Sequence, residues 1–394
     1  MQYVIVGAGI TGLYFAFRLK KMGITDYIIL EQNDSIGGRM ASTDFHGTRV
    51  NLGASIIGEG NRHLLGLCKE LDIELNDSYS DYELLFKGGD KEWFNNKVEE
   101  MYDIFNAENK DEPDESMIDF LQKHLSKDDL VRYVEHIEFY DYLTASKRCT
   151  FESYPVDDMY FGRYMYHTIK GGWDVLIKKL LEKVDVRKVL LKKKVMEITY
   201  EDGSYKIIAN GDVYHSLKLV FATDITFREI KLNGFELPGF TKYMGSMDYV
   251  RLYTYHRKHN LGGAVIGRNY LRKMIPVNEN IIMSAYNDNI FAKKLVSELK
   301  KSGDNVKIIN ELIYDFHGGK YDIAPIESEK DFLISYWDHG SHFYKPGYGW
   351  GKSYFVNDMK NMIICGEMIS KRQGYVEGGV QSVDDFWIKK YRFV

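Results

Sequence analysis

Residues 1–31 read MQYVIVGAGITGLYFAFRLKKMGITDYIILE. Two continuous apolar runs in this stretch, Tyr3–Val6 and Tyr27–Leu30, are typical of strands that are buried on both faces of a parallel sheet. Between them, the apolar positions of residues 13–20 follow helical spacing, and Gly23 ends the predicted helix. The stretch therefore predicts a strand–helix–strand unit, which indicates a doubly wound α/β domain.

The turn between the first strand and the helix carries a G-x-G-x-x-G pattern, Gly7-Ala8-Gly9-Ile10-Thr11-Gly12. In such a turn the first glycine permits the sharp bend, the second lets the backbone approach a pyrophosphate, and the third lets the helix pack closely. The start of the helix also offers unpaired N–H groups and the positive end of its dipole to phosphates. Glu31 and Gln32 follow the second strand, where a carboxylate can accept hydrogen bonds from ribose hydroxyls. The sequence therefore predicts a dinucleotide site.

Composition excludes several classes of protein. The chain has 394 residues, of which 44% are hydrophobic and 28% charged, and these values are typical of a globular protein with room for two domains. The net charge of −5 provides no basic field that would hold nucleic acid or an anionic membrane. No apolar run approaches the roughly 18 residues of a membrane span. We therefore expect no nucleic-acid partner and no membrane span.

Cysteine usage bears on the compartment. Cys68, Cys149 and Cys365 lie far apart, form no CxxC pair and are odd in number, which argues against a disulfide framework and against a structural zinc site. The first predicted strand begins near residue 3, which leaves no room for a cleaved presequence. We therefore expect a cytoplasmic protein without a bound metal.

The rest of the chain gives a coarser pattern of elements. Helical spacing predicts helices over residues 117–125, 129–142 and 174–181. Residues 184–220 alternate as short strands, with turn signals at Asp202-Gly203 and Asn210-Gly211. A strand is predicted over residues 249–256, and residues 361–390 predict a strand, a glycine-rich turn and a helix.

Four separate blocks resemble a known family. The first is the glycine turn with Glu31, and the second is Ile36-Gly37-Gly38-Arg39-Met40, followed by Asn51-Leu52-Gly53-Ala54. The third is Val195-Met196-Glu197-Ile198, and the fourth, residues 364–382, reads ICGEMISKRQGYVEGGVQS. Together they resemble the FAD-dependent amine oxidase superfamily, which also contains protoporphyrinogen oxidases and carotenoid desaturases.

This resemblance implies a fold and a cofactor. The fold would be α/β, with a Rossmann-like FAD-binding domain of the GR2 type interleaved with a mixed α+β substrate domain. The FAD domain would comprise residues 1–78, 169–230 and 345–394, and the substrate domain residues 79–168 and 231–344. FAD is favoured over NAD because the IGGR and GYVEGG segments have no place in a simple NAD domain.

The resemblance also implies which residues hold FAD. In the family the third block holds the adenine through backbone groups, and the fourth holds the pyrophosphate and the ribityl chain. The predicted set is Gly7, Ala8, Gly9, Ile10, Thr11, Gly12, Glu31, Gln32, Gly37, Gly38, Arg39, Asn51, Leu52, Gly53, Ala54, Val195, Gly366, Glu367, Gly374, Tyr375 and Val376. Since no cysteine lies in the stretch where some relatives attach the flavin, we expect FAD to be bound non-covalently.

The family implies a chemistry beside the flavin. Many amine oxidases carry a lysine near flavin N5, and Arg251 aligns with it. Monoamine oxidases hold the amine between two aromatic rings, of which Tyr375 matches one, while the second place falls on Gly340. The predicted catalytic candidates are Tyr375, Arg251, His342, Tyr344 and Trp337.

The resulting expectation is an FAD-dependent oxidoreductase. As an oxidase it would move a hydride from a C–H next to the nitrogen of a small amine or polyamine to flavin N5, and O2 would reoxidise the flavin to give H2O2. One alternative keeps the flavin but changes the substrate, as in a desaturase, a protoporphyrinogen oxidase or a nucleotide-sugar flavoenzyme. For the last of these, Arg251, Arg268 and Arg272 could line a phosphate pocket. Another alternative is a catalytically inactive flavin-bound binding or structural protein, because the expected lysine and half of the aromatic pair are missing.

Overall fold

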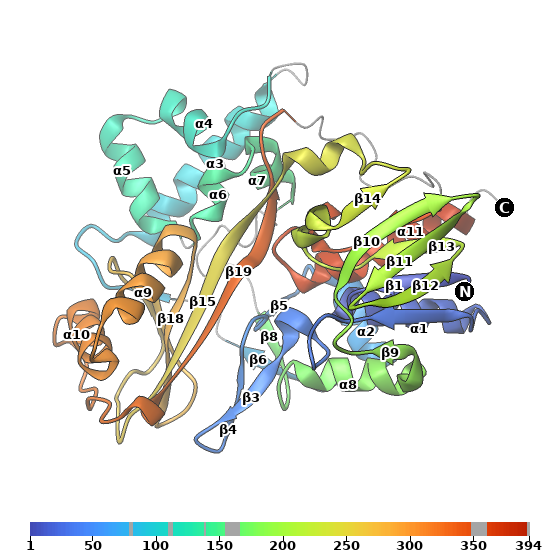
Figure 1. The fold of residues 1–394 in the computed structure, drawn as a ribbon. Helices are drawn as coiled ribbons and strands as arrows, with labels where there is room; N and C mark the ends of the chain where they lie inside the picture. The colour runs from blue at the N-terminus through green and yellow to red at the C-terminus, as the bar shows by residue number, and fades with distance from the viewer. Residues whose placement is uncertain (79–81, 109–112, 138, 154–165, 348–360, 392–394) are drawn as a thin grey trace.

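The computed structural model describes residues 1–78, 82–108, 113–137, 139–153, 166–347 and 361–391. Two long strands, β15 (Met244–Tyr255) and β19 (Phe332–Tyr344), pair antiparallel and run through the middle of the molecule. A parallel sheet with its helices lies on one side of this pair and the remaining helices lie on the other (Figure 1). The two long strands therefore form the boundary at which a site between the two sides would lie.

The parallel sheet has the strand order β20-β13-β1-β2-β9. Its strands are β1 (Tyr3–Val6), β2 (Tyr27–Leu30), β9 (Val189–Leu190), β13 (Lys218–Phe221) and β20 (Met362–Ile364). Helix α1 (Ile10–Lys21) connects β1 to β2, and buries an apolar stripe that includes Leu13 and Ala16. Both predicted strands of the opening unit are found with the predicted bounds, and the Rossmann-like α/β fold is confirmed.

A second sheet is built from hairpins. It contains β10 (Val195–Glu201), β11 (Ser204–Ala209), β12 (Asp212–Ser216) and β14 (Lys231–Asn233). At both predicted turns the two central residues have positive φ, with 50° and 79° for Asp202 and Gly203, and 45° and 88° for Asn210 and Gly211. Two successive positive φ values are the signature of the two-residue turn that matches strand twist, so the predicted hairpins are confirmed.

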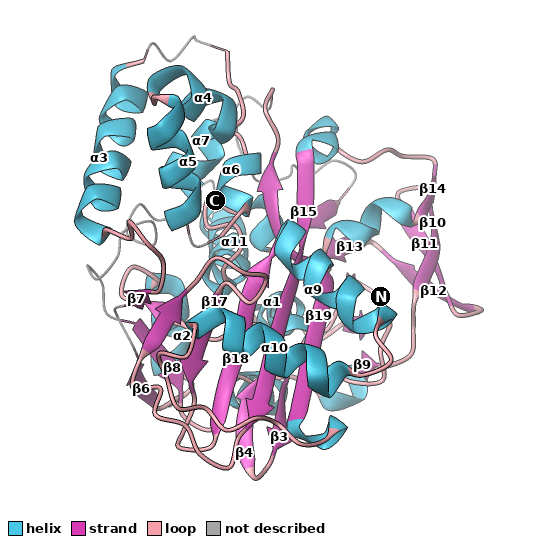
Figure 2. Cartoon of the chain, turned by 90° about the vertical axis from the view of Figure 1, so that its left-hand side faces the viewer, coloured by secondary structure: helices cyan, strands magenta, loops and turns pink. Residues whose placement is uncertain are grey.

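The third sheet has the order β19-β15-β18-β17-β16-β7. Besides the two long strands it contains β7 (Tyr82–Leu84), β16 (Ala264–Ile266), β17 (Lys273–Pro276) and β18 (Ile281–Asp288). Helices α9 (Asn289–Lys301) and α10 (Asn305–His317) cover one face of it, as Figure 2 shows. Val250 and Leu252 of β15 pack with these helices in one core. Because side chains alternate along a strand, Tyr249, Arg251 and Tyr253 belong to the opposite face.

A helical region adjoins the end of the long strands (Figure 1). It comprises α3 (Lys91–Ala107), α4 (Met117–His124), α5 (Lys127–His136), α6 (Asp141–Thr144) and α7 (Lys147–Ser153). The prediction of one helix over residues 129–142 is wrong at both ends. The Ser126 side chain accepts a hydrogen bond from the N–H of Asp129 and so begins α5 earlier, and the chain turns to an extended conformation at Ile137.

The remaining elements support the parallel sheet and the loops around it. They are α2 (Arg62–Glu70), α8 (Asp174–Lys183), α11 (Val376–Tyr391), β3 (Ser42–Phe45), β4 (Thr48–Asn51), β5 (Ile57–Gly58), β6 (Leu75–Ser78) and β8 (Tyr166–Ile169). Short 3₁₀ turns include η1 (Gly38–Met40), η4 (Ile225–Glu229) and η7 (Glu367–Ile369). In the part of the chain that the structure describes, no helix combines the length and the apolar character needed to cross a bilayer. The domain boundaries stay a prediction.

Candidate active site

The glycine turn brings the start of α1 against β1. Gly7 has φ +106°, and a Cβ at this position would lie 2.6 Å from the carbonyl oxygen of Ala222. A Cβ at Gly12 would lie 2.0 Å from the carbonyl oxygen of Gly7, so a side chain there would push the helix away from the turn. Gly9, in contrast, has open space where its Cβ would be, and it lines a cavity. The turn therefore presents bare backbone to that cavity.

Glu31 closes over the same turn. Its side chain is buried, and it accepts hydrogen bonds from the N–H of Ala8 at 2.8 Å and from the N–H and side-chain amide of Asn33 at 2.9 Å. Glu31 also lines the cavity. The carboxylate is thus held in place by main-chain donors, and it remains available at the cavity surface.

A second helix start points into the cavity. A Cβ at Gly379 would lie 2.8 Å from Thr11 Oγ1, so the first turn of α11 packs directly on the first turn of α1. Residues from both helix starts, among them Gly9, Thr11 and Val376, line the cavity. Because each helix start carries unpaired N–H groups and the positive end of a dipole, the place where they meet favours phosphate groups.

A buried ionic network ties three distant segments together beside the cavity. Arg39 donates to Glu367 Oε1 at 2.7 Å and to the carbonyl oxygen of Gly340 at 2.9 Å. Glu367 also accepts from the N–H of Gly374 at 2.9 Å and is hydrogen-bonded to Nδ1 of His342. Although burial alone would raise the pKa of Glu367, the neighbouring His342 and Arg39 lower it to about 2. Glu367 is therefore an ionised structural centre.

His342 belongs to this network and does not face the cavity. It is fully buried, and its Nε2 accepts from the N–H of Ile225 at 3.3 Å. Since a ring nitrogen that accepts carries no proton, Nδ1 is the protonated nitrogen and donates to Glu367. Both ring nitrogens of His342, a predicted catalytic candidate, are therefore hydrogen-bonded to other protein groups.

The cavity has a volume of about 630 Å³ and extends from the glycine turn to the long strands. The predicted cofactor residues that line it are Gly7, Gly9, Ile10, Thr11, Glu31, Gln32, Gly37, Gly38, Arg39, Gly53, Ala54, Val195, Gly366, Glu367, Gly374, Tyr375 and Val376. The predicted cofactor residues that do not line it are Ala8, Gly12, Asn51 and Leu52. Ala8 and Gly12 shape the turn from behind, through the contacts to Glu31 and Gly7 described above.

Asn51 and Leu52 join the loop after β4 to the long strands. The carbonyl oxygen of Asn51 accepts from the Tyr253 hydroxyl at 2.6 Å. The carbonyl oxygen of Leu52 accepts from Ser335 Oγ and from Trp337 Nε1, both at 2.9 Å. The main chain at the end of β4 is thus attached to β15 and β19.

Aromatic rings line the part of the cavity that adjoins the long strands. Tyr375 and Trp337, both predicted as catalytic candidates, are joined there by Tyr249 and Tyr286. Gly340 also lines the cavity, and a Cβ at this position would lie 2.2 Å from Cβ of Tyr249. Tyr249 therefore occupies the space that a side chain at position 340 would need.

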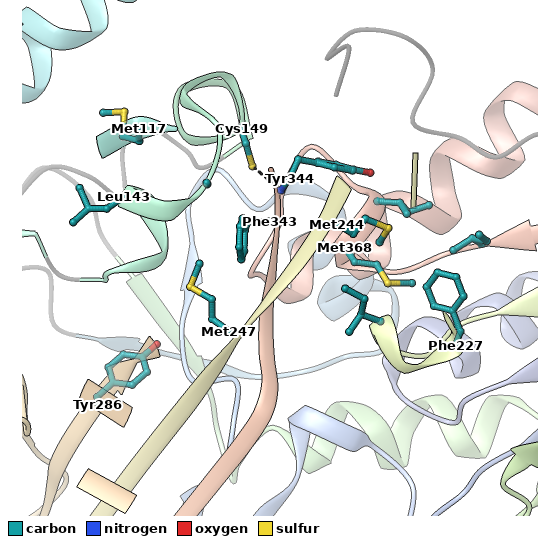
Figure 3. Packing of buried hydrophobic residues seen from close by; sticks show 14 of the residues in the cluster. Met117, Leu143, Cys149, Phe227, Met244, Met247, Tyr286, Phe343, Tyr344 and Met368 are labelled. Atoms are coloured by element: carbon teal, nitrogen blue, oxygen red, sulfur yellow. Dashed lines mark hydrogen bonds between the residues drawn. The ribbon is translucent and has the colours of Figure 1, made fainter. Parts of the chain in front are cut away.

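The other two catalytic candidates also lie outside the cavity lining. Tyr344 is fully buried, and its N–H donates to Sγ of Cys149 at 3.4 Å in a core that includes Met244 and Met368 (Figure 3). Arg251 is only 1% exposed, so it is no surface residue, and its guanidinium lies 4.3 Å from the centre of the Tyr286 ring. Neither touches the cavity surface as the side chains stand.

Two of the arginines proposed for a phosphate pocket, Arg268 and Arg272, lie away from the cavity. Arg268 donates to Glu135 at 2.7 Å, and Arg272 donates to the carbonyl oxygens of Gly267 and Ile137. Neither lines the cavity. The geometry therefore gives no support to a basic nucleotide-sugar site.

Sequence reasoning missed one wall of the cavity. Ala222, Thr223 and Asp224 follow β13 and line it, and Lys193 and Lys194 precede β10. The position of β13 beside β1 supplies the missing signal, because residues after the carboxyl ends of neighbouring parallel strands meet at the binding edge of such a sheet.

The comparisons with known proteins agree with this geometry. A family model described as flavin containing amine oxidoreductase matches residues 10–165. The chain is 38% identical over 94 residues to polyamine oxidase 1 of Zea mays, and 30% identical over 145 residues to a probable flavin-containing monoamine oxidase A of Dictyostelium discoideum. Over these stretches the chain is similar to members of the FAD-dependent amine oxidase superfamily. The superfamily prediction and the FAD prediction are thereby confirmed.

The extent of these matches differs between sequence and fold. The matched stretches cover 23% of this chain and 19% of the maize enzyme, and 36% of this chain and 31% of the Dictyostelium protein. A solved structure of wild-type putrescine oxidase bound to putrescine aligns over 99% of both chains, with a TM-score of 0.75 and 15% identity. The amine oxidase fold therefore extends through the chain, while the sequence likeness is confined to parts of it.

The cavity fits the FAD that this superfamily carries. Two helix starts meet over bare glycine backbone, which suits a pyrophosphate, and the buried Glu31 carboxylate lies where a ribose would follow. Gly38 also has open space where its Cβ would be. The whole cavity has a volume of about 630 Å³. Its aromatic end lies beyond the phosphate end and can enclose a flat ring system.

Proposed function

We propose that this chain is an FAD-dependent amine oxidase that acts on a small primary amine. One observation carries the proposal: the cofactor cradle and an aromatic chamber of Tyr249, Tyr286, Trp337 and Tyr375 are parts of one continuous cavity. The family match and the names of the relatives, a polyamine oxidase and a monoamine oxidase, support the substrate class. When bound, FAD supplies the two-electron acceptor for a C–H bond next to the amine nitrogen, and dioxygen regenerates it with release of hydrogen peroxide.

The residues that would hold FAD divide the work by chemistry. The backbone of Gly9, Thr11 and Val376 would donate to the pyrophosphate, and Glu31 would accept from the ribose. The main-chain groups of Val195, at the start of β10, would contact the adenine. With the three cysteines of the chain buried and free, we propose that the flavin is bound without a covalent link.

The aromatic chamber would bind and orient the amine. Tyr375 and Trp337 offer flat apolar faces to the methylene groups of a substrate, and Tyr249 and Tyr286 close the chamber on the side of β15 and β18. Such walls exclude water from the reacting carbon. Burial raises the pKa of Tyr249 well above its ordinary value, so this hydroxyl stays protonated beside Tyr286.

The test is anaerobic mixing of the holoenzyme with a panel of primary amines, monitored at the flavin absorption band. Bleaching by at least one amine, followed by recovery of the colour and formation of hydrogen peroxide when air is admitted, is the expected result. A flavin that no amine bleaches would instead favour the catalytically inactive alternative or another substrate class. A reducing compartment such as the cytoplasm stays a prediction, to be tested by localisation of the tagged protein.

A further inference from the structure

Arg251 occupies the middle of the β15 face that is turned toward the cavity. Its neighbours two positions away on the same face are Tyr249, which lines the cavity, and Tyr253, which donates to the carbonyl oxygen of Asn51. The side chain is 1% exposed. A permanent positive charge therefore lies inside the protein, on the face of the β15 sheet that is turned toward the cavity.

This charge has an unused hydrogen-bonding edge. Nη1 of Arg251 contacts Sδ of Met283 at 3.5 Å, while Nε and Nη2 have no hydrogen-bond partner among the described residues. Burial lowers the pKa of Arg251, but the nearby phenol groups of Tyr253, Tyr286 and Tyr249 raise it, and the guanidinium stays charged. Nε–H and Nη2–H project from the same edge of a guanidinium, which is one of the two edges that bind a carboxylate through two parallel hydrogen bonds.

Among the residues that the structure describes, Arg251 forms no ion pair, and the two nearby aspartates of β15 and β18 have other partners. The carboxylate of Asp248 is hydrogen-bonded to the Tyr336 hydroxyl and lies 3.8 Å from Lys293, and that of Asp288 accepts from the N–H of Tyr140. A second buried cation, Lys273, has its Nζ 4.9 Å from the Tyr286 ring centre. Since removing a charge from water without an opposite charge is costly, an anion that reached this guanidinium would stabilise it.

The cavity is the route by which such an anion would arrive. The Tyr286 ring lies 4.3 Å from the guanidinium and itself lines the cavity, and it packs at 69° against the ring of Tyr249. The Tyr286 ring thus contacts the guanidinium and also forms part of the wall of the substrate chamber. Ring movement of the Tyr249–Tyr286 pair would open the edge to a ligand that already lies in the chamber.

We propose that the substrate is an amine that also carries a carboxylate, and that Arg251 is the group that recognises this carboxylate. The proposal rests on the proposed function and narrows its substrate class. The amine would lie between the chamber rings with its reacting C–H toward the flavin, and the carboxylate would take the Nε and Nη2 donors. A diamine or polyamine would instead bring a second positive charge close to Arg251 and Lys273, which like-charge repulsion disfavours.

The test compares amines that differ only in the charge of one group. Pentylamine is neutral beyond its amine, 1,5-diaminopentane adds a cation, and 5-aminopentanoate and norleucine add a carboxylate at the far end or on the amine-bearing carbon. The holoenzyme and the variants Arg251→Met and Arg251→Lys are mixed anaerobically with each, and the second-order rate constant of flavin reduction is measured. The FAD content of each variant verifies that it is folded.

We expect at least one carboxylate-bearing amine to reduce the flavin with a second-order rate constant at least tenfold above that of pentylamine. The rate constant of 1,5-diaminopentane should be lower than that of pentylamine. In Arg251→Met the rate constant of the carboxylate-bearing amine divided by that of pentylamine should fall toward one. Arg251→Lys should restore part of this preference. A preference for 1,5-diaminopentane, or an acid preference that survives in Arg251→Met, would overturn the inference and leave the proposed function intact.

A binding measurement keeps the two proposals separable when no amine reduces the flavin. Pentanoate cannot be oxidised at an amine, so its binding to the oxidised holoenzyme is followed by the shift of the flavin spectrum, with pentan-1-ol as the neutral control. We expect pentanoate to bind at least tenfold more tightly to the wild type than to Arg251→Met, and more tightly than pentan-1-ol. Equal binding of acid and alcohol by the wild type would overturn the anion site, whatever the enzyme oxidises.

Discussion

Replacing Glu367 by glutamine should remove a large share of the stability of this protein. The side chain keeps nearly the same shape, so its contacts with Gly374 and His342 can persist, but the negative charge opposite Arg39 is lost. The pKa of Glu367 falls from an ordinary 4.5 to about 2 in the folded protein. At roughly 1.4 kcal/mol for each pKa unit, ionised Glu367 contributes about 3 kcal/mol to the free energy of unfolding at neutral pH.

The dependence on pH gives the prediction its sign. Because the folded pKa lies below the unfolded one, the contribution of Glu367 is complete above about pH 4.5 and is lost as the pH falls through 2. Urea titration of wild type and Glu367→Gln should therefore show a gap of about 3 kcal/mol in the free energy of unfolding at pH 7, and the gap should shrink as the pH falls toward 3.

Glu377→Gln is the matched control for this measurement. Glu377 is also buried and accepts from the N–H groups of His63 and Leu64, but burial raises its pKa. Ionisation of Glu377 at higher pH therefore destabilises the folded wild type, so Glu377→Gln should gain stability relative to wild type as the pH rises. A Glu367→Gln protein within about 0.5 kcal/mol of wild type at pH 7 would refute the idea that the ionic network stabilises the fold.

Other substitutions and one chemical treatment probe the site itself. Glu31→Ala loses a charged acceptor at the predicted ribose position and should weaken FAD binding by about tenfold to a hundredfold in a fluorescence titration, whereas unchanged affinity would place the ribose elsewhere. Gly12→Ala puts a Cβ 2.0 Å from the Gly7 oxygen and should abolish soluble flavoprotein. The control Gly66→Ala, which has open space around its position in α2, should be tolerated. A yellow Gly12→Ala protein with the melting temperature of the wild type would contradict the packing argument. Tyr375→Ala should retain FAD but reduce it at least tenfold more slowly with the best amine, and equal rates would exclude this ring from the substrate chamber. Acid precipitation should release the flavin into the supernatant, and a yellow pellet would show a covalent link.

The opening unit could be predicted because its information is local. The apolar runs of β1 and β2, the spacing of the three glycines, and Glu31 after the second strand lie within 31 residues, and each has its own physical role. The hairpin turns at Asp202-Gly203 and Asn210-Gly211 were predictable for the same reason, since positive φ is a property of those residue pairs.

The chemistry beside the flavin could not be read from the sequence in the same way. Whether Arg251, His342 or Tyr344 reaches a cavity depends on which face of β15 or β19 it occupies and on what packs there, and both strands carry register shifts, one of them between Met247 and Tyr249. Tyr249 filling the space beside Gly340 is a contact between residues 91 positions apart, which no local pattern encodes.

The wrong prediction of one helix over residues 129–142 shows that tertiary contacts also limit the prediction of helix ends. Residues 129–142 keep an amphipathic pattern, yet the chain leaves the helical conformation at Ile137, where the neighbouring His136 stacks on Phe94 of α3. Tertiary packing therefore decided where α5 ends, and the sequence pattern could not show it.

The side chains of Tyr253, Ser335 and Trp337 donate to the main-chain carbonyl oxygens of residues 51 and 52, and these bonds attach the end of β4 to β15 and β19. Because the acceptors are main-chain atoms, this attachment does not depend on the side chains at positions 51 and 52. Any residue supplies the same oxygen. A substitution at Asn51 can therefore leave this attachment to β15 and β19 in place. The donors are specific side chains, so Tyr253→Phe and Trp337→Phe are the changes that would remove hydrogen bonds from it.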